Sequence, residues 1–225
     1  MISRKLRRFS SGSCDEYDNI ESKLVHLQRI IGSTHPGYNR QLPGHSLLPQ
    51  IFFGRRLDRM SVRINCDEVY PNIFIGDEGA ARNKSYLKLI GITHVVNTAE
   101  GTGFCQVNTG EHFYSNVGIK YMGLNVVDVP QAKISIHFAE AADFIDKAIE
   151  SHGRVLIHCL MGLSRSATIT IAYLMIKRGM SLEEALRTVR RHRECRPNDG
   201  FLRQLIDLEL KIRNGGGFAY NRRLH

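Results

Sequence analysis

The chain has 225 residues, a formal net charge of +9, 42% hydrophobic residues and 24% charged residues, a composition typical of a globular domain with extensions. It contains no apolar run as long as a membrane span, and its first residues lack the apolar segment of a secretory signal. The five cysteines lie far apart without the paired spacing of a zinc site, and their odd number indicates a reducing, intracellular environment.

Residues 1–65 are predicted to form an N-terminal extension that is partly helical or disordered. A linker rich in Gly, Pro and polar residues is expected over 32–49. The Arg- and Ser-rich start leaves a mitochondrial transit peptide as a second interpretation. One helix is predicted in the extension from four apolar residues at helical spacing, which are Ile20, Leu24, Leu27 and Ile31.

Residues 66–212 are predicted to form the compact domain, and residues 213–225 a flexible basic tail. Strands alternate with helices along the domain, which predicts an α/β fold with a central, mostly parallel, five-stranded sheet flanked by helices. The predicted strands cover residues 68–76, 92–99, 119–127 and 154–158. The predicted helices cover residues 78–90, 135–152, 167–176, 182–192 and 201–210.

One stretch combines a buried strand, a tight loop and a helix over residues 155–176. The loop starts with Cys159 and ends with Arg165. Backbone N–H groups at the start of a helix, together with the helix dipole, favour an anion and should favour the thiolate form of Cys159. Arg165 can donate two hydrogen bonds to a phosphate. An inert core cysteine and a solvated arginine are the alternatives for each residue alone, but they do not explain the combination.

This motif, His158-Cys159 followed by five residues and then Arg165-Ser166, resembles the signature of the cysteine-based protein tyrosine phosphatases. With Gly162 included, it is most similar to the atypical dual-specificity branch. The resemblance covers about residues 66–212. It implies a protein tyrosine phosphatase-like fold that hydrolyses phosphotyrosine and phosphoserine/threonine in proteins through a phosphocysteine. It also implies MAP kinases as substrates and no cofactor or metal.

The resemblance also implies roles for individual residues. Cys159 would be the nucleophile, and Arg165 would hold the phosphoryl group. Asp128, about thirty residues before the cysteine, would be the general acid; a turn residue before a proline is the alternative. His158 would brace the loop, and Ser166 would assist departure of the thiolate.

Substrate binding would fall mainly to the loop. Arg193 matches an arginine that holds a second phosphate in similar enzymes, and a solvated helix charge is its alternative. The other substrate-binding residues are expected to be Leu160, Met161, Gly162, Leu163, Ser164 and Arg165.

Two other functions stay open: a phosphoprotein-binding, pseudophosphatase-like regulator, and the same chemistry on RNA or phosphoinositide phosphate. The presence of both Cys159 and Arg165 argues against the first, and the apolar Leu160 and Met161 argue against the second. Expected partners are phosphorylated proteins, with neither nucleic acid nor membrane, and a cytoplasmic or nuclear location is expected. The sequence does not predict an oligomeric state.

Overall fold

The computed structural model describes residues 12–36 and 64–215, with side chains from residue 19 onward. Its core is a five-stranded sheet in the order β1-β2-β5-β3-β4, in which only the β1–β2 pair is antiparallel. This confirms the predicted fold class. The strands are β1 (Cys66–Tyr70), β2 (Ile73–Gly76), β3 (His94–Asn97), β4 (Lys120–Gly123) and β5 (Val155–His158).

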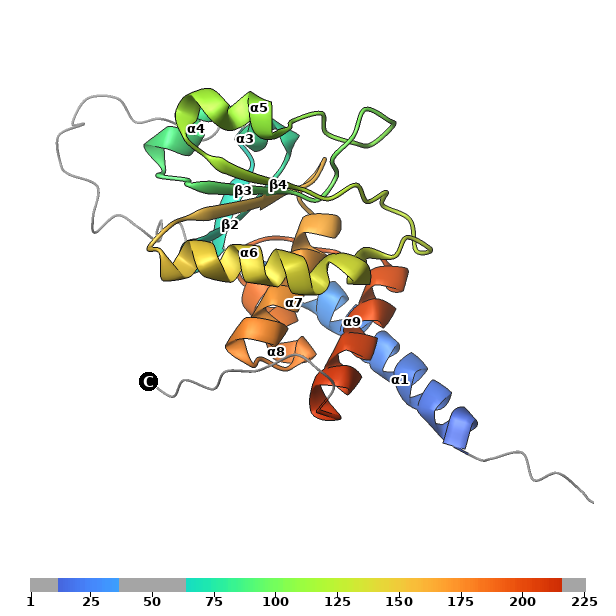
Figure 1. Ribbon diagram of the computed structural model, residues 1–225. Helices are drawn as coiled ribbons and strands as arrows, with labels where there is room; N and C mark the ends of the chain where they lie inside the picture. The colour runs from blue at the N-terminus through green and yellow to red at the C-terminus, as the bar shows by residue number, and fades with distance from the viewer. Residues whose placement is uncertain (1–11, 37–63, 216–225) are drawn as a thin grey trace, which may run out of the picture.

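Helices cover both faces of this sheet (Figure 1). One face packs against α3 (Glu78–Arg82), α4 (Lys84–Leu89) and α5 (Glu111–Tyr114) through a small apolar cluster. The other face carries the larger core, in which α7 is buried along nearly its whole length. The elements on that side are α1 (Gly12–Ser33), η3 (Ile134–His137), α6 (Phe138–Glu150), α7 (Arg165–Arg178), α8 (Leu182–Arg190) and α9 (Asp199–Arg213), and η2 (Ser115–Val117) follows α5.

Two predicted elements are each divided by an asparagine in the structure, and the helix predicted over 135–152 begins as η3 (Ile134–His137) before α6 (Phe138–Glu150). The single strand predicted over 68–76 is the β1–β2 hairpin, and Asn72 adopts a left-handed φ of 64° at its turn. The single helix predicted over 78–90 is α3 followed by α4. Asn83 separates them, because its side chain caps α4 by accepting from the Tyr86 amide at 2.9 Å. An asparagine that competes for backbone groups in this way ends one helix and starts the next.

The strand predicted to reach Asp128 is also shorter than expected. β4 ends at Gly123, and Asp128 lies on the loop that follows. The Val126 amide turns back to the Leu124 carbonyl at 3.0 Å, so the chain leaves the ladder there. The Val126 carbonyl is thereby free to accept a hydrogen bond from the Arg165 side chain at 3.0 Å.

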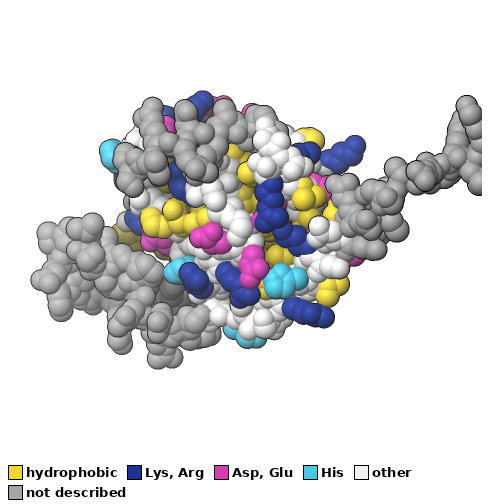
Figure 2. Space-filling view, turned by 90° about the horizontal axis from the view of Figure 1, so that it is seen from below, with side chains coloured by type: hydrophobic (Ala, Val, Ile, Leu, Met, Phe, Trp, Pro, Cys, Tyr) yellow, Lys and Arg dark blue, Asp and Glu magenta, His cyan; other side chains and the backbone are white. Residues whose placement is uncertain are grey.

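The helix predicted in the N-terminal extension is present and packs on the face of the sheet that carries the larger core. Leu24, Leu27 and Ile30 are buried in the larger core against α8 and α9. Polar contacts surround them, including His26 with Glu183 at 2.9 Å. In the view from below, basic, acidic and histidine side chains lie next to one another on this face (Figure 2). The helix of the extension is therefore part of the core. Residues 1–11 and 37–63, the rest of the predicted extension, lie outside the described residues.

Arg190 of α8 fastens the carboxyl end of α1. Its fully buried guanidinium donates to the Thr34 hydroxyl at 2.6 Å and to the Ile31 carbonyl at 2.6 Å, and also to the Thr34 carbonyl. The last carbonyls of a helix carry the negative end of its dipole, and α1 has no basic residue of its own in its last turn. Arg190 supplies that cation from another helix.

Among the described residues, no helix has the combination of length and hydropathy that spanning a membrane would take. Residues 216–225 of the predicted basic tail lie outside the described part of the chain.

Replacing Leu27 by Ala should destabilise the protein by about 2–5 kcal/mol, the usual cost of removing a fully buried leucine side chain. Urea unfolding followed by circular dichroism would measure this change. The matched control is Val25→Ala on the same helix, which should change stability by about 0.5 kcal/mol or less because Val25 is 43% exposed. Equal effects of the two substitutions would contradict the packing of α1 on the core.

Candidate active site

The candidate site lies where the central strand β5 passes into α7 through residues 159–164. β5 is buried on both sides between β2 and β3, so the loop starts from the most constrained part of the sheet. Cys159 is the first loop residue and is only 1% exposed. Its sulfur therefore lies at the base of the loop.

Six consecutive carbonyls of this loop each accept a hydrogen bond from a group that belongs to the surrounding structure. The donors to the first three are the His158 ring, the Glu78 amide and the Arg193 side chain; the donors to the last three are Arg193 again, the Arg196 amide and Thr168. In a trans peptide the N–H points opposite to the C=O. The amides that follow these carbonyls, from Leu160 to Arg165, therefore point into the loop and form an anion-binding cup.

Gly162 allows this loop to close tightly. Its φ of +68° is left-handed, and a Cβ at this position would lie 2.5 Å from the Gly76 carbonyl oxygen and 2.6 Å from Arg193 Nη2. No other residue type fits without displacing a neighbour. The Gly162 amide donates to the Cys159 sulfur at 3.1 Å. The cup thus places a donor directly on the sulfur.

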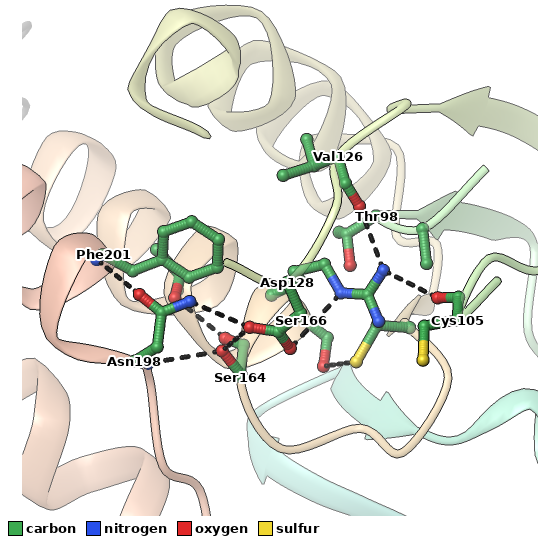
Figure 3. A network of polar contacts seen from close by, with 12 residues as sticks. Thr98, Cys105, Val126, Asp128, Ser164, Ser166, Asn198 and Phe201 are labelled. Atoms are coloured by element: carbon green, nitrogen blue, oxygen red, sulfur yellow. Dashed lines mark hydrogen bonds and ion pairs between the residues drawn. The ribbon is translucent and has the colours of Figure 1, made fainter. Parts of the chain in front are cut away.

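The sulfur has a second polar neighbour at the start of α7. Ser166 Oγ lies 3.4 Å from Cys159 Sγ, and Figure 3 shows the hydroxyl directed at the sulfur. Both residues are buried. Burial raises the pKa of the Cys195 thiol to about 12 and keeps that sulfur protonated, so Cys195 is not a candidate nucleophile.

Arg165 is held with one edge of its guanidinium against the protein. Its Nη1 donates to the carbonyls of Cys105 and Val126, both at 3.0 Å (Figure 3). Its Nε is buried, has no hydrogen-bond partner among the described residues, and lies 3.4 Å from Asp128 Oδ2. A buried donor without a partner costs free energy, so this nitrogen is suited to an anionic ligand.

Asp128 lies at the edge of the cup with its side chain 29% exposed. Its Oδ1 accepts from the Ser164 hydroxyl at 2.8 Å and from Asn198 Nδ2 at 2.9 Å. Figure 3 shows Asp128 between these two residues and the guanidinium. The structure therefore brings the predicted acid next to the predicted nucleophile loop, although they are 31 positions apart.

His158 lies behind the cup, fully buried. Its Nδ1 is 3.4 Å from the Cys159 carbonyl oxygen, and its buried Nε2 has no hydrogen-bond partner in the part of the chain that the structure describes. Burial lowers the pKa of this imidazole to about 4, and the nearby Arg82 and Arg165 charges act in the same direction. His158 is consequently neutral near neutral pH and braces the loop as an uncharged ring.

Arg193 takes a position that the sequence did not indicate. The side chain is 3% exposed; its Nε donates to the Gly162 carbonyl at 2.7 Å and its Nη1 to Asp67 Oδ2 at 2.8 Å. Holding a second phosphate would require the guanidinium to leave these partners, so that role stays a prediction. The observed contacts instead make Arg193 a support of the loop from outside.

Sequence reasoning missed three contributors to the site. Asn198 lies just before the helix predicted over 201–210, and the sequence pattern assigns no role in the site to it, to Cys105 or to Glu78. Cys105 and Glu78 act through a backbone carbonyl and a backbone amide, which no side-chain pattern reveals. Asn198 had a usable signal, because an N-cap uses only the carbonyl oxygen of its amide and leaves the NH₂ group available.

Comparison with known proteins agrees with this geometry. The sequence model described as "Dual specificity phosphatase, catalytic domain" matches residues 73–211. The chain belongs to the dual specificity phosphatase family. It is 43% identical over 201 residues to mouse dual specificity protein phosphatase 13B, covering 89% of this chain and 98% of that protein. It is 41% identical to human dual specificity protein phosphatase 26 over 152 residues, covering 67% of this chain and 70% of that protein.

Solved structures similar to this dual specificity phosphatase share its fold. Human DUSP28 is 29% identical with a TM-score of 0.58, covering 66% of this chain and 95% of that one. A mouse putative dual specificity phosphatase complexed with zinc tungstate is 30% identical with a TM-score of 0.59, covering 67% of this chain and 89% of that one. The family and its relatives identify the chain as a protein-tyrosine/serine/threonine phosphatase.

The buried neutral state of His158 predicts a pH dependence of stability. With a pKa near 4 in the folded protein and about 6.5 when unfolded, the unfolded chain binds more protons between these values. The free energy of unfolding should therefore fall by up to about 3 kcal/mol from this residue as pH drops from 6.5 to 4. Urea titrations of the wild type and of His158→Gln would measure the difference, and an NMR midpoint near 6.5 for this ring would contradict it.

Proposed function

We propose that this phosphatase hydrolyses phosphotyrosine and phosphoserine/threonine in proteins through a phosphocysteine intermediate, with Cys159 as nucleophile and Asp128 as general acid. The observation that carries the proposal is the orientation of the loop: six carbonyls bonded outward leave the amides directed inward around the sulfur. Transferring phosphoryl groups carry negative charge on three oxygens, which such a cup stabilises.

In the first step, the Cys159 thiolate attacks phosphorus in line with the leaving oxygen. The S–P bond forms while the P–O bond to the substrate side chain breaks. The loop amides and Arg165 hold the three phosphoryl oxygens, and Nε of Arg165 gains a hydrogen-bond acceptor that none of the described residues provides. Asp128 gives its proton to the leaving oxygen, so that a neutral alcohol or phenol departs.

In the second step, a water molecule attacks the phosphocysteine. Asp128, now ionised, takes one proton from this water, and the S–P bond breaks to return the thiolate and release inorganic phosphate. Ser166, 3.4 Å from the sulfur, supplies a hydroxyl that stabilises the departing thiolate. Each proton and electron pair is returned, so the enzyme ends as it began without a redox or metal cofactor.

We also propose phosphorylated MAP kinases as substrates. The resemblance of the chain to atypical dual-specificity phosphatases suggests this class, and two exposed apolar side chains on or near the loop support access by a folded phosphoprotein. Met161 on the loop is 62% exposed and Phe104, next to Cys105, is 95% exposed. These uncharged side chains leave the charge of the cup as the main attraction for the phosphate.

Cys159→Ser should abolish hydrolysis of para-nitrophenyl phosphate, because a serine hydroxyl is a far weaker nucleophile than a thiolate. Asp128→Ala should lower the turnover of phenyl phosphate by roughly 100-fold or more, since that poor leaving group depends on a proton donor. Steady-state kinetics measure both changes. Asp143→Ala on α6, whose side chain is 58% exposed, is the control and should retain full activity. Full activity of Asp128→Ala on phenyl phosphate would exclude it as the acid.

The protein should bind doubly phosphorylated MAP kinase activation-loop peptides, and Asp128→Ala should trap them because substrate still enters the cup while turnover is slow. Vanadate and tungstate, tetrahedral oxyanions like the tungstate present with the mouse structural relative, should displace the peptide. Fluorescence anisotropy with labelled peptides measures this. A peptide that is hydrolysed no more efficiently than para-nitrophenyl phosphate would argue against MAP kinases as substrates.

A further inference from the structure

Asn198 joins three parts of the molecule that are far apart in sequence. Its Oδ1 accepts from the Phe201 amide at 3.0 Å and caps α9. Its Nδ2 donates to Asp128 Oδ1 at 2.9 Å, and its backbone amide donates to the Ser164 hydroxyl at 3.3 Å (Figure 3). One residue therefore connects the start of α9, the loop of the predicted acid and the end of the phosphate-binding loop.

The amide of Asn198 can have only one orientation. The Phe201 N–H is a donor, so the atom facing it must be the amide oxygen. The NH₂ group is then directed at Asp128, which as a carboxylate accepts hydrogen bonds. The helix cap and the contact with Asp128 thus fix each other.

Asp128 accepts hydrogen bonds from two uncharged side chains, and both are made to the same carboxyl oxygen. Asn198 Nδ2 and Ser164 Oγ both donate to Oδ1, at 2.9 and 2.8 Å. An oxygen that accepts two hydrogen bonds is a poor place for a proton of its own. The other oxygen, Oδ2, lies 3.4 Å from Arg165 Nε, on the side where the phosphoryl group would be bound.

We propose that Asn198 is a positioning residue for the phosphatase reaction, which together with Ser164 holds Asp128 Oδ1 as an acceptor and so places the transferable proton on Oδ2. This inference rests on the proposed role of Asp128 as general acid. The hydrogen bonds of the Asn198 side chain and amide go to Asp128, Phe201 and Ser164, and it acts through the orientation of the Asp128 carboxyl group.

The surrounding packing makes this orientation rigid. Gly200 lies so close to the Asp128 loop that a Cβ there would be 1.9 Å from the Pro130 carbonyl oxygen. Gln204, one turn further along α9, donates to the Ala132 carbonyl at 2.8 Å. The start of α9 therefore contacts the Asp128 loop at several positions. Among these contacts, the one from Asn198 reaches the Asp128 carboxyl group.

Two substitutions at Asn198 keep the helix cap and change only the group facing Asp128. Aspartate and serine are both good N-caps, so Asn198→Asp and Asn198→Ser should both fold. Asn198→Ser removes the donor without adding charge. Asn198→Asp replaces the donor with a carboxylate that faces Asp128. Asn83 is the matched control, because it also caps a helix, α4, and its hydrogen bonds are made with Ala80, Tyr86 and Leu87 rather than with Asp128.

The readout is the turnover of aryl phosphates with good and poor leaving groups, measured across pH. Both Asn198 variants should lose about tenfold in turnover of phenyl phosphate and much less for an aryl phosphate whose leaving group needs no proton. Asn198→Asp should also move the alkaline limb of the profile to higher pH by roughly one unit, because a second carboxylate favours the protonated form of its neighbour. Asn83→Asp should match the wild type throughout.

Equal losses for good and poor leaving groups would overturn the proposal, because they would indicate a general structural effect. Added to Asp128→Ala, Asn198→Ser should cause no further loss on phenyl phosphate; an additive loss would also overturn it. Phosphatase activity retained by the Cys159→Ser variant would refute the proposed function instead.

A measurement without substrate keeps the two questions separate. The carboxyl carbon of Asp128, assigned by its absence in Asp128→Asn, should titrate at higher pH in Asn198→Asp than in Asn83→Asp when followed by ¹³C NMR. Identical titration in the two variants would show that Asn198 does not act on the Asp128 carboxyl group, whether or not the enzyme is active.

Discussion

The direction of six peptide groups is the constraint on which this active site depends. A loop that turned even one carbonyl inward would present a negative dipole to an anion. The chain prevents this by giving every carbonyl from Cys159 to Ser164 a donor outside the cup. These donors come from β5, α3, α7 and the segment after α8. The cup is therefore a product of the surrounding fold rather than of the loop alone.

Buried arginines fasten the parts of the molecule that must not move. Arg165, Arg190 and Arg193 are each at most 3% exposed and each donates to backbone carbonyls. Burying a guanidinium costs free energy unless its donors are satisfied, and such groups are strongly destabilising when a partner is lost. The planar fork of arginine presents five N–H donors in a fixed geometry, so it can satisfy two or three carbonyls in different directions at once.

The sequence was sufficient for the fold class and for bringing the cysteine and arginine together, because both depend on a strand, loop and helix that are contiguous. The prediction of element boundaries failed where a single asparagine separates two elements, as Asn72 separates β1 from β2 and Asn83 separates α3 from α4. The apolar pattern continues across both positions and gives no sign of a turn. The sequence also predicted Asp128 at the end of a strand. In the structure β4 ends at Gly123, and the Val126 carbonyl accepts a hydrogen bond from Arg165 instead of pairing in the sheet. Long-range backbone contacts of this kind have no side-chain signature.

The segment between α8 and α9 shows why the extension and the site share one structure. At its start, Arg190 bonds both the end of α1 and the Cys195 carbonyl, and just beyond its end Gln28 of α1 donates to Asp199 at 2.9 Å. Between these points, Arg193 and the Arg196 amide support the phosphate-binding loop. Asn198 then reaches Asp128. The same short stretch of chain, residues 190–199, therefore contacts α1, the phosphate-binding loop and Asp128. A shift of α1 would displace the groups that hold the loop around the sulfur.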